Sequence, residues 1–313
     1  MKQKILTVTL NPCLDKTISL NGFFEGGLNR ADSVRSDAGG KGINVAKVLK
    51  GFGADVMALG VMGDKGSEAL LEELARRGID HDFLFVPGTV RTNYKLFDSQ
   101  KGQVTEVNEP GFSVAEKEVL GLVSLIEKHL PEAAVMVLAG SMAPGIPKDM
   151  YQRLITLAQA YHVKVILDAD GEALSLGLLA KPYAIKPNRF ELEQLSGKEL
   201  SDEAALLAYG QTLLDSGVGL LCISLGGEGA LFMTPEAAYR VTPSPIVCQS
   251  TVGAGDSMVA AIAYSNVMGK DLATLSKMAT AAGSVTASKP GTEVCTLEEV
   301  LVYQALLVPE KVR

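Results

Sequence analysis

The strongest constraint on the fold is a regular alternation of short apolar segments with amphipathic ones. Strand-like apolar runs lie at residues 4–10, 55–61, 133–139, 163–168 and 218–225, and helical patterns lie at 43–52, 65–77, 114–129, 147–160 and 202–215. Alternating strands and helices form a parallel sheet covered by helices on both faces, with ligands at the carboxyl ends of the strands. A chain of 313 residues with 47% hydrophobic content can bury one large core of this kind. The sequence therefore predicts an α/β fold in one large domain.

Two segments fall outside this alternation, Thr17 to Ser36 and Val90 to Val107. In the second, the sequences YKLFD and QVTEV alternate apolar and polar residues. This alternation is typical of exposed antiparallel strands. The second segment therefore predicts exposed antiparallel strands outside the main alternation.

The most informative local motif is the turn STVGAGDS at 250–257, which leads into an apolar helical run over 258–268. Small residues at 253–255 allow backbone amides to converge at a helix N-terminus, where the peptide dipoles favour an anion. Asp256 lies on the first turn of that helix and can accept a proton from a hydroxyl that attacks the bound group. The motif predicts phosphoryl transfer to an alcohol, and the alternative is that Asp256 caps the helix.

Two more glycine-rich turns accompany this motif. The sequence AGGKGINVA at 38–46 opens a helical pattern, and SLGGEG at 224–229 follows an apolar strand-like run. The first lacks the spacing of a Walker A loop, and the second lacks that of a dinucleotide-binding fingerprint. Each is compatible with an ordinary turn, but three such turns in one chain favour a functional role.

Composition excludes several other classes of protein. The formal net charge is -7 and no cluster of Lys and Arg is present, which argues against a nucleic-acid surface. The N-terminal sequence MKQKILTVTL becomes polar at Asn11, too early for a signal peptide, and no apolar run has the length of a membrane span. We expect a soluble, cytoplasmic protein.

The cysteines and histidines do not form a recognisable reactive or metal-binding motif. The cysteines lie far apart in the chain at Cys13, Cys222, Cys248 and Cys295. This spacing predicts free, mostly buried thiols in a reducing compartment. The histidines, His81, His129 and His162, are expected to be exposed or helix-capping.

Together these motifs resemble the ribokinase-like (PfkB) family of carbohydrate kinases. GGKGINVA, with Gly53 and Gly63 downstream, and STVGAGDSMVAAI look like the two signatures of the family. LTVTLNPCLD near the N-terminus, GSMAPG at 140–145, IKPNRFEL at 185–192 and SLGGEGA at 224–230 fall in the family's order. The resemblance covers nearly the whole chain and is greatest to the phosphosugar kinase branch.

The resemblance implies a ribokinase-like three-layer α/β/α sandwich with a mostly parallel central sheet. It implies a single kinase domain over residues 1–313, with a small β-sheet lid formed by about 16–36 and 90–108. Such a lid excludes water from the phosphoryl donor. Lids of related kinases also pair between subunits, so the resemblance implies a homodimer through the lid.

The resemblance also assigns catalytic and acceptor-binding roles. Asp256 is the implied base, and the amides of Gly253, Ala254 and Gly255 form the anion hole. The implied sugar-phosphate ligands are Asp15, Gly39, Gly40, Lys41, Asn44, Arg91 and Ser141. Lys41 and Arg91 are candidates to neutralise a phosphate already on the sugar, with Arg30 as a weaker third. The alternatives are that Asp15 is a turn residue and that Asn44 caps its helix.

The implied ATP-binding residues are distributed over the second half of the chain. They are Lys186, Asn188, Ser224, Gly226, Gly227, Gly229, Thr251, Gly255 and Ser284. Asn188 and Glu191 form the family's N-x-x-E motif, which implies water-mediated Mg²⁺ binding, although the same pair has the form of a helix capping box. Asp168 is expected to join this metal network. Ser250, Val252 and Gly291 match a loop that holds a monovalent cation in relatives.

The identity of the acceptor depends on fine features of two motifs. Lys41 within AGGKGINVAKVLK and the sequence STVGAGDS resemble particular members of this branch, and the resemblance implies D-fructose 1-phosphate, phosphorylated at C6 to give fructose 1,6-bisphosphate. Tagatose 6-phosphate, phosphorylated at C1, is the alternative. A neutral sugar or nucleoside would be favoured if Lys41 and Arg91 pointed away from the pocket. A catalytically silent sensor of sugar phosphate or nucleotide is an alternative of another class, disfavoured by the intact Asp256 turn.

Overall fold

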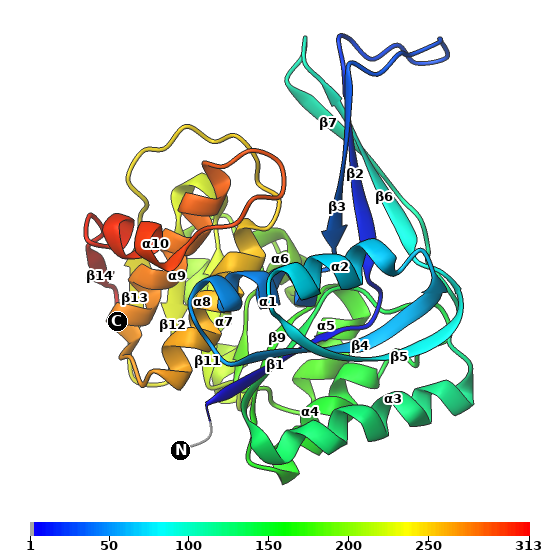
Figure 1. The fold of residues 1–313 in the computed structure, drawn as a ribbon. Helices are drawn as coiled ribbons and strands as arrows, with labels where there is room; N and C mark the ends of the chain where they lie inside the picture. Colours follow the sequence, from blue (N-terminus) through cyan, green and yellow to red (C-terminus); the bar gives the residue numbers. More distant parts are fainter. Residues whose placement is uncertain (1–2) are drawn as a thin grey trace.

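The computed structural model describes residues 3–313 and contains one large sheet and one small sheet (Figure 1). The strands of the large sheet are β1 (Lys4–Thr9), β4 (Val56–Lys65), β5 (Asp80–Thr89), β8 (Ala133–Ala139), β9 (Lys164–Asp168), β10 (Ala184–Ile185), β11 (Leu220–Ser224), β12 (Ala230–Met233), β13 (Ala238–Val241) and β14 (Pro309–Lys311). Their order is β14-β13-β12-β11-β10-β9-β8-β1-β4-β5. The seven strands from β11 to β5 in this order are parallel, and β12, β13 and β14 form an antiparallel edge.

Helices cover both faces of the large sheet. They are α1 (Lys41–Gly51), α2 (Glu68–Arg76), α3 (Glu116–His129), α4 (Met150–Ala160), α5 (Gly171–Leu178), α6 (Arg189–Ser196), α7 (Glu203–Asp215), α8 (Ala254–Val267), α9 (Leu272–Ala287) and α10 (Leu297–Gln304). Successive strand residues such as Val137 and Leu138 belong to different buried clusters, because side chains alternate between the faces of a strand. Helices α1, α2, α8, α9 and α10 supply one cluster, and α3 to α7 supply the other. The predicted three-layer α/β/α fold with a mostly parallel sheet is confirmed.

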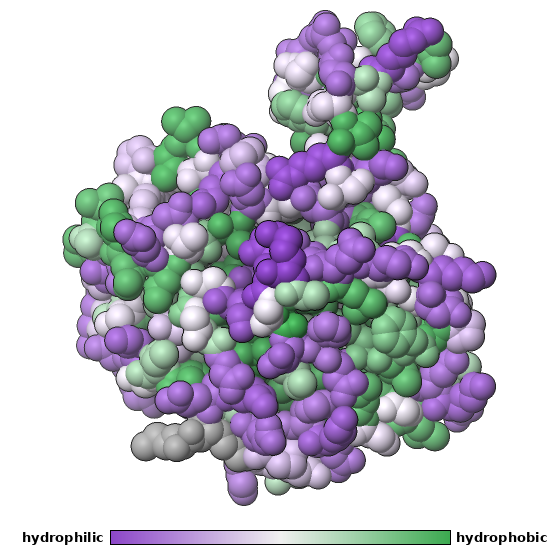
Figure 2. All heavy atoms as spheres, viewed as in Figure 1, coloured by the Kyte–Doolittle hydropathy of each residue, from purple (hydrophilic) through white to green (hydrophobic). Residues whose placement is uncertain are grey.

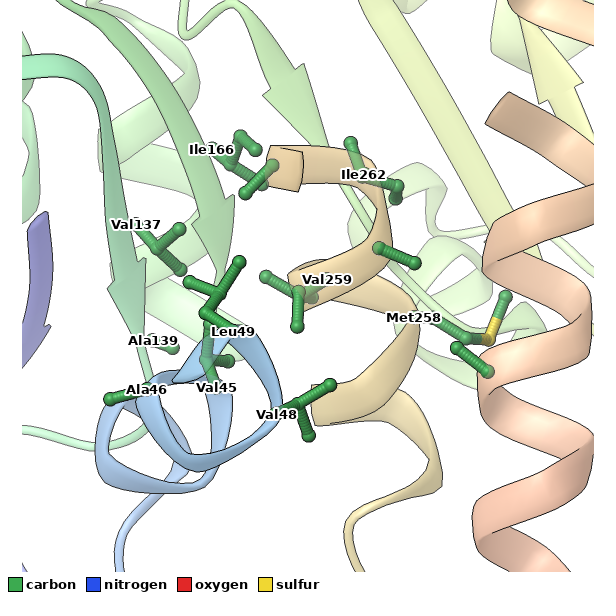
Figure 3. Close-up of a cluster of buried hydrophobic side chains, with 14 of the residues drawn as sticks. Val45, Ala46, Val48, Leu49, Val137, Ala139, Ile166, Met258, Val259 and Ile262 are labelled. Carbon is green, nitrogen blue, oxygen red and sulfur yellow. The ribbon is translucent and has the colours of Figure 1, made fainter. Parts of the chain in front are cut away.

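The packing of α1 against α8 matters most for the site. Val45 and Leu49 of α1 meet Val259 of α8 above Val137 of β8 and Ile166 of β9 (Figure 3). All five side chains are fully buried. Burying a side chain of this size contributes about 1.5–3 kcal/mol. This contact fixes the amino ends of the two helices next to one another, and both begin in glycine turns.

The small sheet contains β2 (Cys13–Leu20), β3 (Ser33–Gly39), β6 (Arg91–Asp98) and β7 (Gln103–Asn108), in the order β3-β2-β6-β7. β6 and β7 pair antiparallel, as the alternation of YKLFD and QVTEV predicts, whereas β2 and β6 are parallel. The far end of this sheet stands clear of the main body (Figures 1 and 2). Exposed apolar side chains on it are Phe24, Leu28, Val34, Val104 and Val107.

Three peripheral features complete the fold. Within residues 3–313, no helix is long and apolar enough to cross a membrane. The four cysteines are free, and Cys248 alone among them is exposed. His129 differs from the expectation of an exposed or capping residue, because its side chain is largely enclosed and its Nε2 lies 2.8 Å from Asp82 Oδ2.

Candidate active site

The site lies at the carboxyl ends of the parallel strands, where two pockets adjoin. The first is a cavity of about 430 Å³ between the strand ends and the lid, and the second is a cavity of about 740 Å³ beside α8 and α9. Lys41 lines both pockets, Asp256 lines the first, and Ala254 and Gly255 line the second. A group bound at the N-terminus of α8 therefore lies on the boundary between them.

The first pocket gathers most of the predicted acceptor ligands. The lining residues include Asp15, Gly40, Lys41, Asn44, Arg91, Ser141 and Asp256. Gly39 is not a lining residue but packs behind Asp15, since a Cβ on Gly39 would lie 2.5 Å from Asp15 Oδ2. Arg30 is exposed in the lid and lies outside this pocket.

The lid contributes three acceptor-pocket residues that the sequence analysis did not identify, Asn93, Lys95 and Asn108. Asp15 is a buried residue within strand β2 rather than a turn residue, and it pairs in register with Asn93 of β6. Lys95 Nζ lies 3.4 Å from Asp15 Oδ1. Asn93 and Lys95 are two residues apart on one strand and so face the same side. This two-residue spacing could have identified Asn93 and Lys95 as pocket residues, but only with the knowledge that β6 pairs with β2.

Further lining residues that had not been assigned to the acceptor come from the ends of β1 and β8, the start of β2 and the turns before α5 and α8. They are Thr9, Asn11, Cys13, Ala139, Gly140, Asp170 and Val252. Burial raises the pKa of the Cys13 thiol to about 12, so this side chain is a neutral wall of the pocket. The remaining polar members add hydrogen-bonding groups to the charged residues above.

Arg91 is held at the pocket edge by three acceptors. Its Nη1 donates to the carbonyl of Glu109 at 3.3 Å, and its Nη2 donates to the carbonyl of Asn11 at 3.2 Å and to Ser141 Oγ at 3.3 Å. The guanidinium Nε is buried and has no hydrogen-bond partner among the described residues. A fixed guanidinium beside a hydroxyl is well suited to bind a phosphate.

Asp256 does not cap helix α8 in this structure. Helix α8 begins after Gly253, whose φ of 78° is in the left-handed region that glycine adopts freely, and no side chain caps the helix. Asp256 Oδ2 instead accepts a hydrogen bond of 2.9 Å from Asn44 Nδ2. Burial raises the pKa of Asp256 to about 6, and the negative charge of Asp168 acts in the same direction. Such a pKa suits a group that must take up a proton near neutral pH.

Asn44 likewise does not cap α1. The N-cap residue of α1 is Gly40, and no side chain forms a capping hydrogen bond there. The Asn44 side chain is buried and lies between Asp256 and Lys47. The alternative of a capping Asn44 is therefore wrong for this structure.

Close to Asp256 lies a cluster of the buried Asp168 and two lysines, of which Lys186 is buried and Lys41 is partly exposed. Asp168 Oδ1 is 3.4 Å from Lys41 Nζ and 3.5 Å from Lys186 Nζ. Asp168 holds the pKa of Lys41 above its usual value, so Lys41 is a cation. Burial alone would raise the pKa of Asp168, but Lys186 and Lys41 together hold it below its usual range. The two lysines provide local positive charge in a protein of net negative charge.

The second pocket is lined by every residue assigned to ATP and by the N-x-x-E pair, whereas Asp168, expected in the metal network, is not among its lining residues. The assigned residues in this pocket are Lys186, Asn188, Glu191, Ser224, Gly226, Gly227, Gly229, Thr251, Gly255 and Ser284. Additional walls come from Met258, Thr280, Gly283 and Ala287, and from a loop containing Pro243, Ser244, Pro245, Ile246 and Cys248. Gly229 has a φ of 94°, and a Cβ there would lie 2.0 Å from the Val241 carbonyl oxygen. This turn therefore requires glycine.

The N-x-x-E pair adopts the capping-box geometry. Glu191 N donates to Asn188 Oδ1 at 2.8 Å, and Asn188 N donates to Glu191 Oε2 at 2.9 Å. Within residues 3–313, no group of three His, Cys, Asp or Glu side chains is arranged to hold a metal ion directly. Asp168 Oδ2 is a buried oxygen that has no hydrogen-bond partner in the described part of the chain. These oxygens fit a hydrated metal that arrives with the nucleotide better than a metal held by the protein alone.

Comparisons with known proteins agree with this geometry. The chain matches the family model of the pfkB family carbohydrate kinases over residues 8–299. It is 42% identical over 268 residues to 1-phosphofructokinase of Xanthomonas campestris, covering 84% of each chain, and 35% identical over 282 residues to that of Rhodobacter capsulatus, covering 90% and 89%. The solved structure of phosphofructokinase-2 from Escherichia coli in complex with potassium matches with a TM-score of 0.91 and 30% identity, over 97% of this chain and 99% of that one.

The protein belongs to the pfkB family of carbohydrate kinases. Its fold and family are those of an ATP-dependent phosphosugar kinase.

Proposed function

We propose that the protein is a 1-phosphofructokinase, which transfers the γ-phosphoryl group of ATP to the C6 hydroxyl of D-fructose 1-phosphate and releases ADP and fructose 1,6-bisphosphate. The observation that carries this proposal is the position of Asp256, a buried carboxylate where a polar acceptor pocket meets a larger glycine-rich pocket. The relatives named 1-phosphofructokinase support the choice of acceptor.

In the acceptor pocket, Asp15 accepts hydrogen bonds from sugar hydroxyls, and Arg91 with Ser141 binds the phosphate already on the sugar. The C6 hydroxyl then lies beside Asp256. One oxygen of Asp256 accepts from Asn44, so the other is free to accept the proton of the hydroxyl. The hydroxyl oxygen forms the new bond to phosphorus as the bond to the leaving ADP oxygen breaks.

Lys41 takes a different role from the one that the sequence suggested. Because it lines both pockets and is charged, it is placed to contact the phosphoryl group in transit rather than the distal phosphate of the sugar. The backbone amides of Gly253, Ala254 and Gly255 complete the anion site at the start of α8, where the first amides of a helix lack intrahelical acceptors. Charge that develops in transfer is thereby met by fixed donors.

ATP binds in the second pocket, with its phosphates toward Gly226, Gly227 and Gly255 and its adenine toward Ser284. Mg²⁺ would supply charge neutralisation on the phosphates of the nucleotide, and Asn188 and Glu191 would hold it through water. A monovalent cation fits the loop of Ser250, Val252 and Gly291, since Ser250 Oγ donates to the Gly291 carbonyl at 2.7 Å and closes that loop.

We expect the protein to act in the cytoplasm as a homodimer that pairs through the lid. The exposed apolar side chains of the lid, Phe24 and Leu28 among them, are more easily explained by a partner than by solvent. Sedimentation equilibrium should give twice the chain mass. A Phe24→Glu, Leu28→Glu variant should sediment as a monomer.

Tagatose 6-phosphate remains the alternative acceptor, because it also carries one phosphate and one primary hydroxyl. A neutral sugar is disfavoured because Arg91, placed to bind a phosphate on the acceptor, lines the acceptor pocket. A catalytically silent sensor is disfavoured because a pure binder has no need for a buried base at an anion site.

The test is release of ADP from MgATP in the presence of fructose 1-phosphate, tagatose 6-phosphate, fructose 6-phosphate or fructose. The proposal predicts the highest kcat/KM with fructose 1-phosphate. A higher value with tagatose 6-phosphate would reassign the acceptor and keep the kinase mechanism. Absence of turnover with every acceptor would favour the sensor.

A further inference from the structure

A buried lysine outside both pockets connects to the catalytic base through one side chain. Lys47 lies on α1, three residues after Asn44, and its side chain is enclosed within the core. Its Nζ lies 3.3 Å from Asn44 Oδ1 and also donates to the carbonyl of Ala38, at the end of lid strand β3. Lys47 lines neither pocket, so it does not touch either substrate.

The chemistry of the two groups fixes the orientation of Asn44. An ammonium has three donors and no acceptor, so only the carbonyl oxygen of the Asn44 amide can face Lys47. The amide nitrogen must then face the other way, toward Asp256, where the distance from Nδ2 to Oδ2 is 2.9 Å. An amide without such a neighbour can rotate and present its oxygen to Asp256 once the carboxyl has taken up a proton.

We propose that Lys47 is a positioning residue for phosphoryl transfer: it locks the Asn44 amide so that one oxygen of Asp256 is always occupied and the other always points at the acceptor hydroxyl. The inference rests on the proposed function of Asp256 as the base. The bond from Lys47 to the Ala38 carbonyl also ties this orientation to the turn where the lid joins α1.

The burial of Lys47 is poorly explained by packing alone, because a lysine loses its hydration when it is buried. Burial lowers the pKa of Lys47, so holding a cation at this point is unfavourable. Its charged surroundings are Glu73 of α2, Arg77 at the C-cap of α2, Asp37 of β3 and Asp15 of β2. None of these forms an ion pair with Lys47 within 4 Å, so its hydrogen bonds to Ala38 and Asn44 are its direct polar contacts among residues 3–313.

A double-mutant cycle on kcat tests the proposal. Lys47→Met should lower kcat about tenfold with little change in the KM of ATP, and Asn44→Ala should lower it at least as much. The double variant should be no slower than Asn44→Ala alone, because Lys47 acts only through Asn44. Lys50→Met, an exposed lysine on the same helix, is the matched control and should leave kcat unchanged. Multiplicative losses in the double variant would assign Lys47 a structural role and overturn the proposal.

A second readout does not need turnover. The pKa of Asp256, followed by its carboxyl ¹³C resonance, should rise in Lys47→Met as in Asn44→Ala, because the ionised carboxylate loses a fixed donor. The other charges facing Asp256 are Asp168, Lys41 and Lys186, and they are the same in all variants. An unchanged pKa in folded Lys47→Met would contradict the proposal. Lys47→Arg keeps a group that only donates, so it should retain the pKa of wild type, and it serves if the methionine variant does not fold.

The kinetic cycle and the pKa measurement together distinguish a failure of the proposed function from a failure of the role of Lys47. If wild type phosphorylates another acceptor, or none, the proposed function fails and the pKa measurement still decides the role of Lys47. If wild type phosphorylates fructose 1-phosphate and the cycle is multiplicative, the proposed function stands and the role of Lys47 fails.

Discussion

The two halves of the active site are built from different materials. The acceptor pocket is lined by charged and amide side chains, several of them supplied by the lid, such as Lys95 and Asn108. The nucleotide pocket is lined largely by glycines, small residues and a proline-containing loop. Under the proposed function, side-chain charge would recognise a small sugar phosphate, whereas the phosphates of ATP would meet backbone amides. Side-chain substitutions should therefore affect the acceptor far more than the nucleotide, except at the boundary.

Apart from the change at the base Asp256 itself, the largest effect is expected at Lys41, which belongs to both halves. Lys41→Met should lower kcat about 10²-fold, because a cation on the transferring group is lost, and it should change the acceptor KM little. Steady-state kinetics with both substrates varied would check this, with thermal unfolding to confirm that Asp168 is still accommodated. A raised acceptor KM at unchanged kcat would instead place Lys41 on the sugar's own phosphate.

The next effect concerns the stability cost of the base. The pKa of Asp256 is about 6 in the folded protein, against an ordinary value of 3.8. The folded state therefore keeps its proton to higher pH, and the stability that this proton provides is present below pH 4 and lost as the pH rises through 6. Asp256→Asn removes this loss. The free energy of unfolding of the variant minus that of wild type should therefore be about 2–3 kcal/mol larger at pH 8 than at pH 4, which means that the variant gains stability relative to wild type as the pH rises.

Urea unfolding of both proteins across that range would measure the difference. A difference that does not vary with pH would mean that the pKa of Asp256 is not raised by burial. The same result would argue that the active site does not lose stability by holding a buried base.

A smaller effect is expected on the acceptor side alone. Arg91→Ala should raise the KM of fructose 1-phosphate about 30-fold, since a charged hydrogen bond contributes about 2 kcal/mol, and it should leave the KM of ATP unchanged. Arg91→Lys keeps the charge without the planar guanidinium, so its KM for fructose 1-phosphate should fall between those of wild type and Arg91→Ala. Equal changes in both KM values would break the division into two pockets.

The smallest effect is expected on the nucleotide side. Ser284 lines that pocket, and its Oγ donates to the Thr280 carbonyl at 2.9 Å. Ser284→Leu should occupy space intended for adenine and raise the KM of ATP about tenfold, with the acceptor KM unchanged. Ser284→Ala removes the hydroxyl without adding bulk and is the control. If the leucine variant binds ATP normally, the adenine must lie elsewhere.

The contrast between the pockets also explains what the sequence could predict. The glycine turns of the nucleotide side are local motifs, so each of their assigned residues could be found without knowledge of the fold. The lid residues Asn93 and Lys95 come together with Asp15 only through the parallel pairing of β2 and β6, a contact between segments some 80 residues apart. No local pattern encodes that register.

The fold followed the same rule. Strand and helix periodicity predicted the central sheet, whereas the two-residue strand β10 and the edge strand β14 are too short to produce a periodic signal. The ion pair of Lys41 with Asp168 was missed because each residue, taken alone, fitted a different role. Lys41 lies at the start of α1 and Asp168 at the end of β9, far apart in the sequence, so only the fold brings the two residues together.

The central claim is that Asp256 is the base at the boundary of the two pockets. The most direct test is a single-turnover transfer from MgATP to fructose 1-phosphate by wild type and Asp256→Asn, with the binding of both substrates measured by calorimetry. The account predicts that the variant binds both substrates about as well as wild type and transfers about 10³-fold more slowly. It also predicts that wild-type kcat/KM falls below a pH of about 6. Transfer by the variant at a rate near that of wild type would contradict the assignment of Asp256 as the base.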